Sequence, residues 1–153
     1  MLGAGAQLNG IGDPISVAVD ATVCISLIQN EELHIFGELP GYSFYVPEEV
    51  LREVRRPAQA AELENAIESG GIERIAITDL DELLIFAELR DGRRLGAGES
   101  ACIALAQSRN LHIATDELRR CRREILQRLG EHRLLTTAAL RQLARDHNIL
   151  GQS

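Results

Sequence analysis

Short runs of apolar, often β-branched residues alternate along the chain with longer stretches in which apolar residues recur every three or four positions. The short runs are typical of strands buried on both faces, and the longer stretches are typical of amphipathic helices. The predicted strands cover residues 15–20, 42–46, 72–78 and 111–115, with 133–137 as a candidate fifth strand. The predicted helices cover residues 21–39, in one or two pieces, and 48–54, 58–71, 79–92, 99–110, 116–130 and 138–150.

This alternation of strands and helices predicts an α/β fold. Parallel strands need crossover connections, and the helices in those connections cover both faces of the sheet. We therefore expect three layers, with a central parallel sheet of four to five strands and helices on both sides. Residues 15–153 are expected to form this single domain, and residues 1–14 a flexible N-terminal lead.

Composition and charge narrow the choice of partners. The 153-residue chain has a net charge of −7, and all sixteen of its basic residues are arginine. An acidic chain gains little from counterion release on a polyanion, so any contact with nucleic acid must be local. With no long apolar run and no signal-peptide pattern, we expect a cytoplasmic protein and no membrane partner. The three cysteines, far apart and odd in number, indicate buried or free thiols.

Two aspartates follow predicted strands directly. Asp20 ends the first strand, and Asp116 ends the strand at 111–115. In open parallel sheets ligands bind beyond the carboxyl ends of the strands, which makes both residues candidates for a site. The alternative for each is a helix N-cap, a position where aspartate is common.

The stretch GAGESACIALA at 96–106 resembles a phosphate-binding fingerprint at first sight. No buried strand precedes it, however, and a carboxylate in the first turn of a helix would repel a pyrophosphate. Glu99 heads the apolar stripe of this helix, so we predict that it faces inward and that the glycines let the loop bend tightly to present it.

Glu53 lies at the edge of another apolar helical stripe, where the alternative role is a flanking salt bridge. Four inward acids, Asp20, Glu53, Glu99 and Asp116, would repel one another without a cation between them. Carboxylate oxygens suit hard divalent ions, so Mg²⁺ or Mn²⁺ is predicted. The four histidines are scattered and provide no softer site.

Four stretches in this order resemble the PIN domain of metal-dependent ribonucleases, a family that includes toxins of many prokaryotic toxin–antitoxin pairs. They are VAVDATVCI, YVPEEVLREV, LGAGESACIALA and LHIATDELRR, and the resemblance covers residues 15 to 146. The first stretch matches a pattern of aspartate followed two residues later by serine or threonine, and each of the others contains one acid. The matching residues are Asp20, Thr22, Glu53, Glu99, Thr115 and Asp116.

The resemblance implies one or two Mg²⁺ or Mn²⁺ ions in an acidic pocket and hydrolysis of phosphodiester bonds in RNA. Asp20, Glu99 and Asp116 would hold the metal, and Glu53 would complete the catalytic set. Thr22 and Thr115 would orient the ligands. The resemblance further implies a cognate antitoxin protein and a homodimer as partners.

Arg119 and Arg120 follow the last acid and are candidate contacts to substrate phosphates. Cations are disfavoured in the first turn of a helix, which hints at a functional reason, although a solvated face is the alternative.

Two other functions remain in view. A PIN-like domain with little or no activity would act as a binding or scaffold module. A phosphatase with Asp20 as nucleophile is disfavoured because Thr22 stands where a second aspartate is expected.

Overall fold

The computed structural model describes residues 12–151, so most of the expected lead at 1–14 lies outside the described residues. Within them, five parallel strands form one sheet in the order β3-β2-β1-β4-β5. The predicted α/β class is therefore confirmed, with the candidate fifth strand at one edge. The strands are β1 (Ile15–Val19), β2 (Tyr42–Pro47), β3 (Glu73–Ile75), β4 (His112–Ala114) and β5 (Leu134–Leu135).

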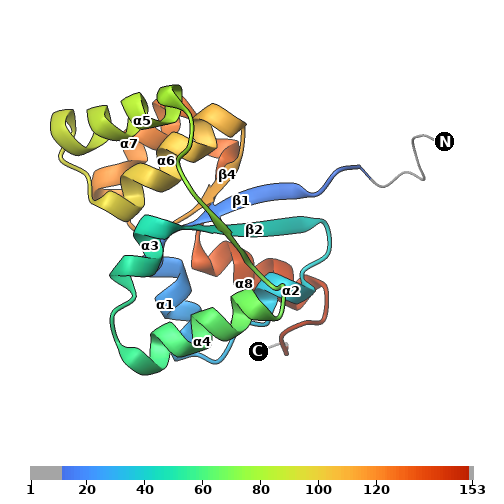
Figure 1. Ribbon diagram of the computed structural model, residues 1–153. Helices are drawn as coiled ribbons and strands as arrows, with labels where there is room; N and C mark the ends of the chain where they lie inside the picture. The colour runs from blue at the N-terminus through green and yellow to red at the C-terminus, as the bar shows by residue number, and fades with distance from the viewer. Residues whose placement is uncertain (1–11, 152–153) are drawn as a thin grey trace.

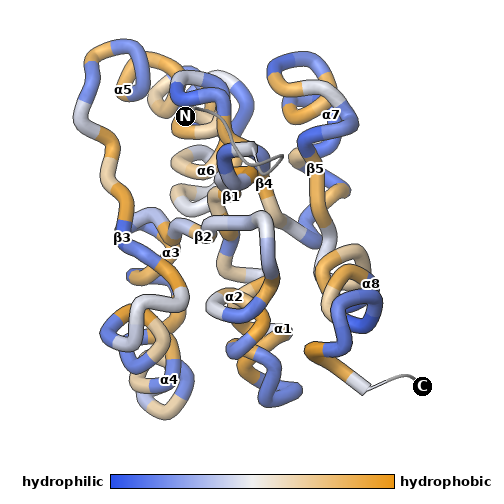
Figure 2. Tube along the Cα trace, turned by 90° about the vertical axis from the view of Figure 1, so that its right-hand side faces the viewer, coloured by the Kyte–Doolittle hydropathy of each residue, from blue (hydrophilic) through white to orange (hydrophobic). Residues whose placement is uncertain are grey.

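Helices cover both faces of the sheet, which gives the predicted three layers. In Figures 1 and 2, α5, α6 and α7 lie on one face, and α1, α2, α4 and α8 lie on the other. The short helix α3 follows β2 at the carboxyl end of the sheet (Figure 1). The helices are α1 (Ala21–Gln29), α2 (Ile35–Glu38), α3 (Glu48–Glu53), α4 (Pro57–Glu68), α5 (Leu80–Ala87), α6 (Ala97–Arg109), α7 (Leu118–Arg128) and α8 (Thr137–Asp146).

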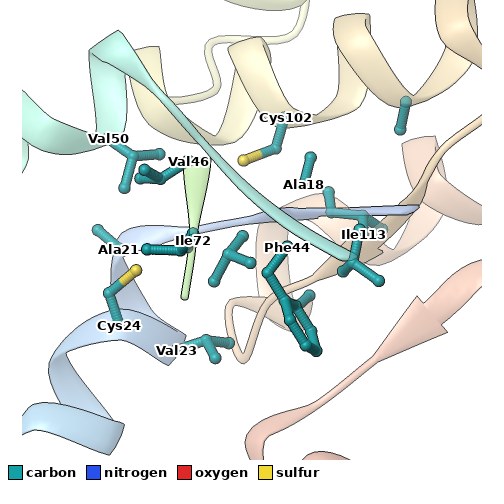
Figure 3. Packing of buried hydrophobic residues seen from close by; sticks show 14 of the residues in the cluster. Ala18, Ala21, Val23, Cys24, Phe44, Val46, Val50, Ile72, Cys102 and Ile113 are labelled. Atoms are coloured by element: carbon teal, nitrogen blue, oxygen red, sulfur yellow. The ribbon is translucent and has the colours of Figure 1, made fainter. Parts of the chain in front are cut away.

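The central strand β1 carries the core. Val17, Ala18 and Val19 are fully buried, because α6 packs on one face of the strand and α1 lies on the opposite face. Figure 3 shows Cys102 of α6 on one side of the sheet and Cys24 of α1 on the other. All three cysteines are buried free thiols, in agreement with the prediction.

Several element boundaries differ from the sequence pattern. The helical stretch predicted at 21–39 forms two pieces, α1 and α2, which is one of the two expected forms, whereas the third strand shrinks from 72–78 to Glu73–Ile75. Helix α5 continues into a wider π-helical turn at Glu88–Gly92, and α6 begins at Ala97 rather than at residue 99. Local patterns set the centre of an element, whereas packing and end contacts set its limits.

Helix α5 buries a charged residue and exposes three leucines. Glu82 is fully buried, whereas Leu80, Leu83 and Leu84 are 68%, 52% and 59% exposed. The buried carboxylate is satisfied by Arg109 at the end of α6, whose Nε lies 2.5 Å from Glu82 Oε2. This pairing turns the leucines outward. No helix of residues 12–151 has the length and apolar character needed to span a membrane.

Candidate functional site

Asp20 lies at the carboxyl end of the central strand, beside the end of β4. Val19 pairs with Ala114, and the Asp20 amide donates to the Ala114 carbonyl at 2.9 Å. The residue is only 2% exposed. It occupies the N-cap position of α1 yet makes no side-chain capping hydrogen bond, so capping does not account for it.

Two threonine hydroxyls hold the Asp20 carboxylate. Thr115 Oγ1 donates to Asp20 Oδ2 at 2.9 Å, and Thr22 Oγ1 donates to the same oxygen at 3.2 Å. Each hydroxyl also accepts a backbone hydrogen bond, from the amide of Glu117 to Thr115 and from that of Asp116 to Thr22, both at 3.0 Å. The strand-end geometry thus fixes the orientation of Asp20 from two directions.

Glu53 and Glu99 approach Asp20 from α3 and α6. Glu53 Oε2 accepts from the Gly98 amide at 3.2 Å, and Glu99 Oε1 accepts from the Gly96 amide at 2.7 Å. Glu99 is 8% exposed and occupies the third position of α6, where its carboxylate caps the helix. Three acids from three separate elements therefore gather at one edge of the sheet.

Gly96 and Gly98 matter to this site because they lack a side chain, and not because of their backbone conformation. Neither residue has a positive φ, so the tight bend predicted to present Glu99 does not use the left-handed backbone conformation that favours glycine. A Cβ at Gly98 would lie 2.2 Å from Glu53 Oε1, and one at Gly96 would lie 3.0 Å from Glu99 Oε1. Both glycines leave room for a carboxylate against the start of α6.

The cluster carries negative charge that the protein compensates only in part. Burial raises the pKa of Asp20, and the nearby Glu99 and Glu53 carboxylates add to the rise, against the hydrogen bond from Thr115. Within residues 12–151, Asp20 and Glu53 have no ion-pair partner. The cation at the site is Arg120, whose Nη2 lies 3.5 Å from Glu99 Oε2 and 3.7 Å from Glu117 Oε2.

Asp116, the fourth predicted acid, lies at the rim of the cluster. It is exposed, and its carboxylate accepts hydrogen bonds from Thr137, at 2.8 Å from the amide and 2.7 Å from Oγ1. These contacts cap the start of α8, 21 residues further along the chain. Sequence reasoning missed Thr137 because no local pattern links it to Asp116.

Within residues 12–151, no hydrogen bond or ion pair joins Arg119, the aromatic residues of β2, His112 or His132 to the three acids of the cluster. Phe44 is buried against Phe36, with ring centroids 4.9 Å apart. Tyr42, at the start of β2, stacks on Phe44. His112 and His132 contact each other edge-on. Arg119 is exposed on the first turn of α7.

The comparison with known families decides the identity of this fold. A family model described as "PIN domain" matches residues 16–147, nearly all of the described chain. The chain belongs to the PIN domain family.

Solved structures agree with this fold. A toxin–antitoxin complex from Klebsiella pneumoniae superposes with a TM-score of 0.53 at 17% identity, covering 79% of this chain and 97% of that chain. VapBC2 from Rickettsia felis, bound to a DNA fragment from its promoter, gives 0.52 at 14% identity, covering 80% and 97%. PAE2754 from Pyrobaculum aerophilum gives 0.53 at 19%, covering 85% and 90%. No curated protein matches the sequence.

The acids of this PIN domain fit a hard divalent cation by the chemistry of their donors. The cluster offers carboxylate oxygens, and within residues 12–151 one guanidinium, that of Arg120, opposes its charge. Within the described residues, no three histidine, cysteine, aspartate or glutamate side chains stand together in metal-binding positions. Glu53 and Glu99 are instead turned onto the amides of Gly98 and Gly96. The carboxylate oxygens are ligands that suit Mg²⁺ or Mn²⁺. In this structure, however, the Glu53 and Glu99 side chains are oriented toward backbone amides.

Proposed function

We propose that this PIN domain is a metal-dependent endoribonuclease that hydrolyses phosphodiester bonds of RNA. The observation that carries the proposal is the gathering of Asp20, Glu53 and Glu99 at the carboxyl edge of the sheet, where, among the described residues, only Glu99 has an ion-pair partner. Burying several carboxylates close together costs free energy unless a cation compensates their charge. Such clusters are found preferentially at functional sites. PIN domains are usually nucleases, which agrees with this chemistry.

Asp20, Glu99 and Asp116 are proposed to hold the metal, and Glu53 to complete the pocket by orienting the attacking water. Thr22 and Thr115 keep Asp20 in place through their hydrogen bonds. Asp116 would have to leave Thr137 in order to act from the rim. When bound, Mg²⁺ or Mn²⁺ supplies charge neutralisation at the phosphate and lowers the pKa of a coordinated water.

Arg120 and Arg119 are proposed to contact substrate phosphates beside these acids. Arg120 already reaches the cluster through Glu99, so exchanging a carboxylate for a phosphate oxygen requires only a side-chain movement. Arginine suits this role because its planar guanidinium pairs with two phosphate oxygens at once.

Cleavage of single-stranded RNA of mixed sequence in the presence of Mn²⁺ tests the activity. We expect cleavage by the wild type and none by Glu99→Gln, with both proteins showing the same circular dichroism spectrum. A separate test is thermal melting, in which Mn²⁺ should raise the Tm of the wild type but not that of the double variant Asp20→Asn/Asp116→Asn. RNA left intact across several substrates would contradict the nuclease assignment.

The second candidate function is a binding or scaffold module with little activity. It is favoured by the ion pair between Arg120 and Glu99 and by the backbone hydrogen bonds of Glu53 and Glu99, which satisfy the acids without metal. The same two assays separate the candidates, because a scaffold gives neither cleavage nor a Mn²⁺-dependent rise in Tm.

An antitoxin protein is the proposed partner, since two of the similar folds come from toxin–antitoxin assemblies. A homodimer is proposed through α5, whose exposed leucines Leu80, Leu83 and Leu84 form an unusually apolar outer face. Light scattering on the double variant Leu80→Ser/Leu84→Ser tests it. The wild type should have twice the monomer mass and the variant the mass of one chain, whereas equal masses would reject this interface.

A further inference from the structure

Two histidines meet at the start of β4, which is the opposite end of this strand from Asp116. His112 is the first residue of β4, and His132 lies in the short 3-10 helix at Glu131–Arg133, two residues before β5. The two rings stand edge-on, with their centroids 6.4 Å apart. The histidine pair therefore joins the chain that leads into β5 to the neighbouring strand.

Gly130 makes room for the His132 ring. This glycine follows α7 with a φ of +95°, a backbone conformation that other residues rarely adopt. A Cβ at this position would lie 3.0 Å from His132 Cε1 and 3.1 Å from His132 Nδ1. The ring therefore rests directly on the glycine backbone, and the turn holds it beside His112.

Arg133 fixes a positive charge next to this pair. Its Nε donates to the Leu111 carbonyl at 3.0 Å, and its Nη2 donates to the carbonyls of Leu111 and Ala106, both at 2.7 Å. These contacts tie the guanidinium to the end of α6 and the start of β4. Arginine stays protonated at every pH that the folded chain meets, so this charge is permanent.

A proton on either ring would meet positive charge. The charged groups that face His112 are Arg133 and His132, and burial together with these two neighbours lowers the pKa of His112. Within residues 12–151, no carboxylate forms a hydrogen bond or an ion pair with either imidazole, and the adjacent Glu131 pairs with Arg122 at 3.0 Å. Histidines gain protons between about pH 7 and pH 5, so acid would put three positive charges together at this corner.

The strand next to this corner is short and leads to Asp116. β5 has two residues and pairs with β4 at the edge of the sheet. The Leu135 carbonyl accepts from the Thr115 amide at 3.0 Å, and Thr137, two residues after β5, donates twice to Asp116. In Figure 2 the chain runs from α7 through β5 to α8 along this edge. Loosening of the chain at His132 would therefore reach Thr137 through β5.

We propose that His112 and His132 form an acid-sensitive latch on β5. With neutral rings the pair holds the start of β5 against β4, and with protonated rings their repulsion loosens β5 and releases Asp116 from Thr137. Because the pKa of His112 is lowered in the folded chain, the stability that its neutral ring contributes is present above about pH 6.5 and is lost as the pH falls below it. The consequence for cleavage rests on the proposed nuclease function, in which Asp116 acts only after it leaves Thr137.

Amide hydrogen exchange at pH 7.5 and pH 5.5 in EDTA, with rates corrected for the intrinsic effect of pH, tests the latch. In the wild type, the Thr115 and Thr137 amides should lose about tenfold in protection at the lower pH. Two unit charges 6.4 Å apart at a partly exposed site change an equilibrium by about an order of magnitude. The Asp20 amide, which donates to Ala114 across β1 and β4, should keep its protection.

His132→Gln removes one ring of the pair at an exposed position and should reduce the pH-dependent loss to less than about threefold. His34→Gln is the matched control, because it replaces an exposed histidine before α2 and should keep the tenfold loss.

Four outcomes would overturn the latch. They are unchanged protection of Thr137 in the wild type, an equal loss in His132→Gln, removal of the loss by His34→Gln, and an equal loss at the Asp20 amide. None of these measurements uses metal or RNA, so failure of the latch is distinguishable from failure of the nuclease assignment.

Discussion

Gly98 gives the sharpest test of how the acid cluster is built. Alanine at this position would place a Cβ 2.2 Å from Glu53 Oε1 and 3.2 Å from Val50 Cγ2, whereas ordinary contacts begin at 3.4 Å. The Glu53 carboxylate would have to withdraw by about 1 Å and lose its hydrogen bond from the Gly98 amide. A misplacement of about 1 Å at a catalytic group can lower activity about 100-fold.

The same substitution should leave stability almost unchanged. Gly98 lies in the first turn of α6, and replacing a helical glycine by alanine stabilises a helix by up to about 1 kcal/mol. The lost hydrogen bond costs about 1 kcal/mol, and the flexible end of Glu53 can swing away. We therefore expect the free energy of unfolding to change by less than about 1 kcal/mol.

Urea unfolding and RNA cleavage with Mn²⁺, measured on the same preparation, check this prediction. Gly92→Ala is the matched control, because the nearest atom to its Cβ would be Glu88 Cγ at 3.9 Å. The control should keep both stability and cleavage rate. Cleavage by Gly98→Ala within threefold of the wild type would refute the idea that this glycine makes room for a working Glu53.

Three further predictions concern ionisation and capping. The pKa of Glu82 is lowered to about 2, chiefly by the hydrogen bond from Arg109. Glu82→Gln should therefore lower the free energy of unfolding at pH 7 by about 3 kcal/mol. Urea unfolding should show this difference from the wild type disappearing as the pH falls from 4.5 to 2. Because burial raises the pKa of Asp20, the contribution of this residue to stability is present at low pH and is lost as the pH rises. Asp20→Asn should therefore raise the Tm measured in EDTA at neutral pH. An unchanged or lower Tm would contradict the claim that burial of the charged carboxylate destabilises the fold. Thr137→Val removes one hydrogen bond to Asp116 and should lower the free energy of unfolding by about 1 kcal/mol, while a full loss of secondary structure by circular dichroism would show a larger role than capping.

Much of the candidate site could be predicted from one-dimensional patterns. Asp20 follows a buried strand, and Glu99 heads an apolar helical stripe, so both positions are visible in local sequence. Their burial at the carboxyl edge follows from the rule that parallel strands end on the same side of a sheet. What the pattern could not give was the partner of each carboxylate, because Gly98 and Glu53 are 45 residues apart.

The sequence by itself determined the order of strands and helices, the three-layer class and the placement of acids at strand ends, because these depend on periodicity and neighbouring residues. Only the tertiary structure decided which side chains meet. In the folded chain Thr137 donates a hydrogen bond to Asp116, and Arg120 forms an ion pair with Glu99. Glu82 is buried against Arg109, and three leucines of the same helix face solvent. Such choices depend on distances between segments far apart in the chain, where burial, hydrogen-bond satisfaction and charge are resolved together.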